Sequence, residues 1–184
     1  MSIFISIVAG TGLVLVGLLL GISGCASPSI SSYRETKPKV DIRTYFNGKL
    51  KAFGTVQDYT GKVVSRFSAD IIGSWQGNIG TLDETFTYED GTTEKRVWTF
   101  ELAEDGTFKG RAHDVIGDAI GKQEGSAVFM EYTLRRTING RTLDFTMDDR
   151  LYLLDDIHMM NQTKMKKFGI TVAELNIGFY KVSE

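Results

Sequence analysis

Side chains that could catalyse a reaction are few in this sequence, and their spacing is poor. Only two histidines occur, and His113 is followed directly by Asp114, so this pair could act as a general base with its orienting carboxylate. Adjacent residues of a strand point to opposite faces, however, so these two side chains are not expected to meet. No nucleophile elbow, zinc-protease motif or phosphate-binding loop occurs either. We therefore predict no catalytic residue and no enzymatic activity.

Patterns that could bind a metal are equally weak. His158 lies in a methionine-rich stretch, where thioether and imidazole ligands could capture copper, although packing is the ordinary role of such residues. The adjacent aspartates at 148–149 and 155–156 lack the spacing of the oxygen ligands in a calcium loop. Cys25 is the only cysteine, which excludes a thiolate metal site and a disulfide framework. We predict no metal and no other cofactor.

A stronger signal comes from polar residues on strand faces that are otherwise apolar. Because side chains alternate along a strand, Glu84, Arg96 and Asp149 are expected to point inward among aromatic residues. Buried charge is costly, so these groups should pair with one another or with a ligand. An apolar pocket with a few convergent polar groups is the general form of a small-molecule site. The predicted ligand-binding residues are Trp75, Glu84, Phe86, Arg96, Trp98, Asp114, Tyr132, Phe145 and Asp149.

The elements that would position these side chains are strands separated by turn signals. Turn residues recur about every 8–12 residues from Lys49 onward, including an Asn-Gly pair at 139–140. The glycine-rich stretch 115–125 is expected to be a bulged strand or a mobile loop, and short helical turns are expected at 42–46, capped by Asp41, and at 166–168. The predicted strands are 50–57, 62–75, 82–88, 94–102, 107–114, 126–136, 142–154, 157–165 and 171–182.

This pattern predicts an all-β fold. Consecutive hairpins favour an up-and-down meander, and closure into a barrel removes the edge strands that would otherwise aggregate. We expect an antiparallel lipocalin-like (calycin-type) barrel of about eight to ten strands, which could hold one small ligand. A β-sandwich is the alternative. The net charge of −2 and the absence of a basic block exclude nucleic acid as a partner.

The N-terminal region predicts where the protein works. Residues 4–20 are apolar and uncharged, as in a secretory signal, and Ile22-Ser23-Gly24 precedes Cys25. This arrangement resembles a bacterial lipobox, which implies that Cys25 becomes a diacylated N-terminus carrying chains of the palmitate type. An uncleaved transmembrane anchor is the alternative. We expect a signal peptide at 1–24, a lipidated cysteine and flexible tether at 25–40, and one barrel domain at 41–184. Ala26 in place of aspartate implies the periplasmic face of an outer membrane.

Several short stretches also carry a resemblance to a family. They are Tyr45-Phe46-Asn47-Gly48-Lys49-Leu50, Gln57-Asp58, Gly61-Lys62-Val63-Val64, Arg96-Val97-Trp98-Thr99 and Lys167-Phe168-Gly169. Together they resemble the DUF3833 family of bacterial lipoproteins, which implies a single-domain envelope protein and no catalytic residue.

Three functions remain open at this point. The first is a membrane-anchored envelope lipoprotein that binds or shuttles a lipid, a fatty acid or another apolar molecule, with Arg96 meeting its headgroup. The second is a solid-core lipoprotein, with a salt-bridge network around Arg96, that acts through its outer surface. The third is an enzyme acting on lipids, for which Glu84 or Asp149 would be the candidate base.

Overall fold

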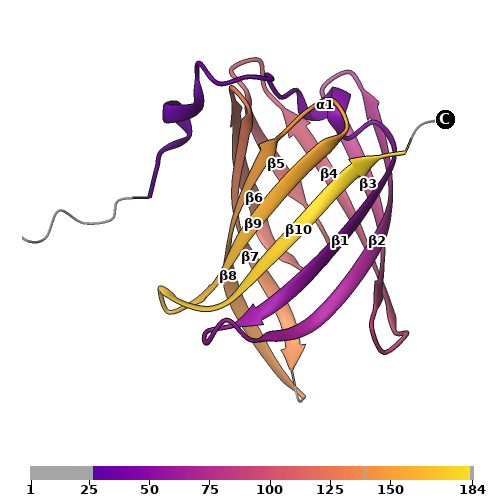
Figure 1. The fold of residues 1–184 in the computed structure, drawn as a ribbon, viewed down its shortest axis with the longest axis vertical. Coiled ribbons are helices and arrows are strands. Elements are labelled where there is room, and N and C mark those ends of the chain that lie inside the picture. Colours follow the sequence, from indigo (N-terminus) through magenta and orange to yellow (C-terminus); the bar gives the residue numbers. More distant parts are fainter. Residues whose placement is uncertain (1–26, 139, 183–184) are drawn as a thin grey trace, which may run out of the picture.

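The protein folds as a closed antiparallel barrel of ten strands (Figure 1). The computed structural model describes residues 27–138 and 140–182, so the predicted signal peptide and Cys25 lie outside the described residues. Each strand pairs with its neighbour in the sequence, and β1 pairs with β10 to close the barrel. The predicted barrel and its meander are therefore confirmed, and the sandwich alternative is not. Among the described residues, no helix is long and apolar enough to span a membrane.

The strands follow the expected turn signals closely. Asp58 shows how the turns are built, because its carboxylate accepts hydrogen bonds from the backbone and the hydroxyl of Thr60. Gly61 then adopts a φ of 84°, which favours glycine. The strands are β1 Gly48–Asp58, β2 Val63–Gln76, β3 Ile79–Tyr88, β4 Thr93–Leu102, β5 Thr107–Arg111, β6 Val115–Glu124, β7 Ala127–Ile138, β8 Arg141–Leu153, β9 His158–Lys167 and β10 Ile170–Lys181.

Three local predictions are refined by the structure. The strand predicted at 107–114 ends at Arg111, because the next residues turn the chain into β6. The stretch 115–125 is the bulged strand β6 and not a loop, with a shift in its pairing between Ile116 and Ile120. The helical turn predicted at 166–168 was wrong. There, β9 continues to Lys167, and Phe168 and Gly169 form a tight turn with φ values of 51° and 79°.

One end of the barrel is closed by the short helix α1, Ile42–Tyr45 (Figure 1). Asp41 caps this helix as predicted, accepting a hydrogen bond from the backbone of Arg43. The hydroxyl of Tyr45 donates to the carbonyl oxygens of Ile157 and Phe179, at 3.1 and 3.2 Å. These contacts hold α1 against the ends of the strands.

The segment predicted as a flexible tether is, from Ile30 onward, bound to the barrel wall. It contains the 3-10 turn η1, Ile30–Tyr33, which lies against β6 and β7. Arg34 forms an ion pair with Glu124 at 2.6 Å, and the backbone N–H of Val40 donates to the carbonyl of Gly125 at 2.7 Å. We call residues 30–40 the strap. Its polar composition indicates a linker, and only the long-range partners show that it is ordered.

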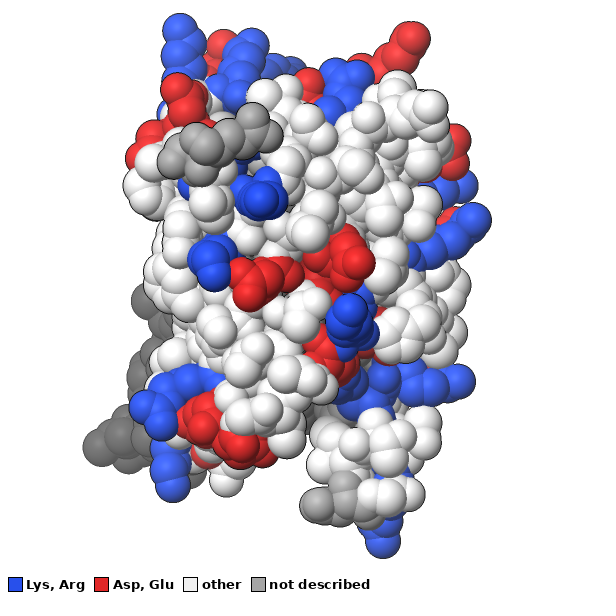
Figure 2. Space-filling view, turned by 90° about the vertical axis from the view of Figure 1, so that its right-hand side faces the viewer, with Lys and Arg blue, Asp and Glu red and all other residues white. Residues whose placement is uncertain are grey.

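The outer surface carries charges of both signs. Figure 2 shows the face on the right-hand side of Figure 1, where basic and acidic side chains are interspersed with uncharged surface. No continuous basic area is visible on that face.

Candidate functional site

The barrel encloses a cavity of about 270 Å³. Residues from nearly all of the strands face it, together with Ile42 and Phe46 at the closed end. Most of the wall is apolar, because the inward positions of the strands are mostly aliphatic or aromatic. The cavity therefore lies where the alternation of side chains predicts the barrel interior.

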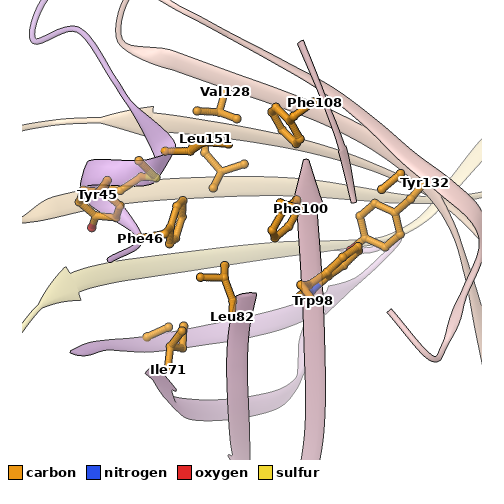
Figure 3. Close-up of a cluster of buried hydrophobic side chains, with 14 of the residues drawn as sticks. Tyr45, Phe46, Ile71, Leu82, Trp98, Phe100, Phe108, Val128, Tyr132 and Leu151 are labelled. Atoms are coloured by element: carbon orange, nitrogen blue, oxygen red, sulfur yellow. The ribbon is translucent and has the colours of Figure 1, made fainter. Parts of the chain in front are cut away.

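An aromatic cluster forms part of this wall (Figure 3). The rings of Trp98 and Phe100 stack with their centroids 5.3 Å apart, and Tyr132 meets Trp98 edge-on at 5.3 Å. Phe108 contacts Phe100 edge-on at 5.8 Å. Rings held by such mutual contacts give the cavity a fixed apolar side.

The cavity is more accessible at the end opposite α1. Inward residues near α1, such as Leu50 and Ile71, are fully buried. Inward residues near the β1–β2 and β9–β10 hairpins, such as Val56, Met165 and Leu175, are only partly buried. We call this end of the barrel, opposite α1, the mouth.

Polar side chains gather on the cavity wall in the middle of the strands. Glu84 on β3 and Arg96 on β4 are direct cross-strand neighbours, and so are Asp149 on β8 and Thr163 on β9. The hydroxyl of Thr163 donates to Oδ1 of Asp149, and the amide of Asn161 donates to the Thr163 hydroxyl at 3.1 Å. All five residues line the same cavity.

Arg96 is neutralised by a partner from outside the cavity wall. Its Nη2 and Nε donate to one carboxylate oxygen of Asp114, at 2.7 and 3.1 Å. Nearer the mouth, Arg136 donates two hydrogen bonds to Glu94, which also accepts one from Tyr88 at 3.1 Å. Both cations of the cavity wall are therefore held in ion pairs.

Burial changes the acidity of the cavity carboxyls. It raises the pKa of Glu84 to about 7, with Arg96 opposing the rise and the nearby carboxylates reinforcing it. Burial also raises the pKa of Asp149 to about 6, against the hydrogen bond from Thr163 and the charge of Arg96. The same desolvation holds the pKa of Tyr132 well above its usual value. Both carboxyls thus take up protons near neutral pH.

Two buried polar atoms of the cavity wall lack a hydrogen-bond partner within the described part of the chain. They are Nε1 of Trp75 and Oδ1 of Asn161. Buried polar groups are almost always hydrogen-bonded in folded proteins. These atoms are therefore positions where a bound molecule could make hydrogen bonds.

The structure brings most of the predicted ligand-binding residues together. Two do not line the cavity, namely Asp114, which lies behind Arg96, and Phe145, which is buried in the core with the Lys167 ammonium 5.5 Å from its ring centroid. The predicted residues that do line it are Trp75, Glu84, Phe86, Arg96, Trp98, Tyr132 and Asp149.

Sequence reasoning missed Asn161, Thr163 and Arg136. Alternation from Met159 to Met165 places Asn161 and Thr163 on the inward face of β9, so the signal was present. His158, the residue of this strand that the sequence analysis singled out, is exposed and contacts the Asp155 carboxylate at 2.9 Å.

The histidine–aspartate pair considered as a general base is separated as expected. His113 is exposed, whereas Asp114 is buried and bonded to Arg96. Among residues 27–138 and 140–182, no group of three histidine, cysteine or acidic side chains is arranged to hold a metal ion.

The chain belongs to the DUF3833 family, whose model is described as "Protein of unknown function (DUF3833)" and matches residues 19–181. The family prediction is thereby confirmed. No curated protein matches the sequence.

Among solved structures, the chain is similar to the S-type phycobiliprotein lyase CPES from Guillardia theta. The TM-score is 0.58 at 9% sequence identity, and the match covers 75% of this chain and 89% of that chain. At this identity the likeness shows the lipocalin-like barrel fold alone.

Proposed function

We propose that this protein binds one small, largely apolar molecule, such as a lipid, inside the barrel. The observation that carries the proposal is the cavity of about 270 Å³ with its apolar wall and few convergent polar groups. Small-molecule sites have this composition, and their volumes begin at about 300 Å³. Because the cavity is at the small end of this range, it fits one slender molecule.

The cavity favours binding over the solid-core alternative. The ion pairs of Arg96 with Asp114 and of Arg136 with Glu94 give part of the polar network a structural role. These ion pairs do not fill the barrel interior, where the cavity remains. A solid core would be closely packed and would contain no void of this size.

We also propose that Cys25 carries a lipid anchor that holds the protein at an envelope membrane, on the periplasmic face of an outer membrane. The lipobox-like residues before Cys25 support this proposal. The strap, which follows shortly after Cys25, is bound to β6 and β7 beside the closed end of the barrel. An anchored protein would thus present its mouth away from its point of attachment.

A second candidate function is an interaction made by the rim of the mouth. Phe168 is 92% exposed, Tyr59 is 83% exposed and Ile170 is 69% exposed, and they lie on the adjacent β1–β2 and β9–β10 hairpins. Such apolar side chains at loop tips are typical of contact surfaces. Replacing Tyr59 and Phe168 by serine should abolish cross-linking to an envelope partner if the rim is its binding surface.

The binding proposal is tested with the full-length protein purified from its own host. Native mass spectrometry and organic extraction should find one apolar molecule per chain. The variant Ala69→Phe, which fills the cavity from β2, should lose this molecule, whereas Ser68→Phe on the outer face of the same strand should keep it. Circular dichroism checks that both variants fold.

Added ligands can be followed without a label. The chain has two tryptophans, Trp75 and Trp98, and both line the cavity, so intrinsic fluorescence reports on its occupancy. A folded protein that carries no molecule and whose fluorescence responds to no added amphiphile would overturn the proposal.

A further inference from the structure

The polar part of the cavity is rich in hydrogen-bond acceptors. Glu84 is 9% exposed, Asp149 is 6% exposed and Asn161 is 4% exposed, and all three line the cavity. Each presents oxygen atoms, and together they come from three different strands, β3, β8 and β9. A ligand that occupies the cavity must satisfy these acceptors or leave them desolvated at a cost.

The orientation of the Asn161 amide follows from its neighbours. The Thr163 hydroxyl gives its only proton to Asp149, so its oxygen can only accept a bond from Asn161. The NH₂ group of Asn161 must therefore face Thr163, which directs the carbonyl oxygen Oδ1 elsewhere. This oxygen is buried and has no donor within the part of the chain that the structure describes.

Around the cavity, carboxyl groups outnumber cationic side chains. Arg96 is surrounded by three carboxyls, those of Glu84, Asp114 and Asp149, and is already bonded to Asp114. The other cation of the wall, Arg136, is bonded to Glu94. Within the described residues, Glu84 and Asp149 thus have no ion-pair partner of their own.

We propose that the ligand of this cavity is an apolar molecule with a positively charged amine, whose nitrogen binds among Glu84, Asp149 and Asn161. A protonated primary amine donates three hydrogen bonds, and these three side chains can accept them. The inference rests on the proposed binding function and narrows its ligand class. It disfavours a fatty acid, because the Arg96 guanidinium that would have met a carboxylate is held by Asp114.

Three probes of equal chain length separate the possibilities: decylamine, decanol and decanoate. They are titrated at pH 8 into the delipidated full-length protein, with tryptophan fluorescence as the readout. Decylamine should bind at least about tenfold more tightly than decanol, and decanoate most weakly.

Variants locate the effect. Glu84→Gln and Asp149→Asn should each weaken decylamine binding by about tenfold and leave decanol binding within about twofold. Asp83→Asn is the matched control, since Asp83 precedes Glu84 on β3 and points outward. At the pH 8 of the titration, above the pKa of about 7 of Glu84, it should change each affinity by less than about twofold.

The outcomes distinguish this inference from the function on which it rests. Equal binding of decylamine and decanol, or tighter binding of decanoate, would overturn the amine assignment and leave the binding function intact. Failure of all three probes to bind the folded protein would overturn the binding function itself. Loss of the amine preference in Asp83→Asn would overturn the assignment to Glu84.

Discussion

The guanidinium of Arg96 and the carboxylate of Asp114 form a double hydrogen bond, 2.7 Å from Nη2 and 3.1 Å from Nε. Arg96 lies on β4, whereas Asp114 belongs to the turn that precedes β6. Both side chains are largely buried. This pair neutralises the cation of the cavity wall and leaves the acidic groups of the cavity available to a ligand.

Breaking this pair should be costly. In Asp114→Ala the buried guanidinium loses its bonded partner, and the free energy of unfolding should fall by about 3 kcal/mol. Urea denaturation measures the change. The control is Asp70→Ala, which removes the exposed partner of Lys51 and should have a much smaller effect. Equal losses in the two variants would contradict the role given to Asp114.

Glu84 should make stability depend on pH. Its pKa is about 7 in the folded protein against 4.5 in the unfolded chain, because burial and the charges of Asp149, Asp114 and Asp83 outweigh the attraction of Arg96. The folded state therefore binds the proton more tightly, and stability is lost as the pH rises from about 4.5 through 7.

The variant Glu84→Gln isolates this contribution. Relative to the wild type, its free energy of unfolding should rise by about 3 kcal/mol between pH 4.5 and pH 8, which corresponds to the shift in pKa. Denaturation curves at several pH values give the difference. A gap between the two proteins that does not change with pH would show that Glu84 titrates normally.

The affinity for an amine should rise with pH, whereas the stability of the protein without a ligand falls. Glu84 and Asp149 lose their protons near pH 7 and pH 6, so the affinity for decylamine should increase from pH 5 to pH 8. Decanol carries no charge over this range, so its binding should stay constant. In Glu84→Gln the increase should become smaller. A decylamine affinity that does not vary with pH would contradict the predicted ionisation.

Closure of the barrel by α1 should depend on Gly73. A Cβ atom at this position would lie 1.8 Å from the carbonyl oxygen of Phe46, so alanine would push the end of α1 away from β2. We expect Gly73→Ala to lower the free energy of unfolding by about 1–3 kcal/mol. The control is Ser74→Ala, which changes an exposed residue next to it. Similar stabilities would show that α1 adapts without cost.

The strap should be protected from hydrogen exchange. The N–H of Val40 donates to the carbonyl of Gly125, and a Cβ on Gly125 would lie 1.7 Å from the carbonyl oxygen of Tyr33. The Val40 amide should exchange slowly in the wild type and faster in Gly125→Ala. Rapid exchange of the Val40 amide in both proteins would show that the strap is a flexible tether, as the sequence predicted.

Much of the barrel follows from local patterns. Alternation identifies the inward face of each strand, so the positions of Glu84, Arg96 and Asp149 could be predicted before any pairing was known. The hairpins follow from short turn motifs such as the one at Asp58. Both signals depend only on neighbours along the chain, which is why the sequence alone determined them.

The partners of these residues depend on tertiary structure. Asp114 reaches Arg96 from a turn, and Thr163 meets Asp149 only in the register that joins β8 to β9. The cavity exists because the side chains of ten closed strands leave their shared interior partly unfilled, a property of summed volumes and closure. Alternation states that a side chain points inward, whereas the geometry of the closed barrel decides what it meets there.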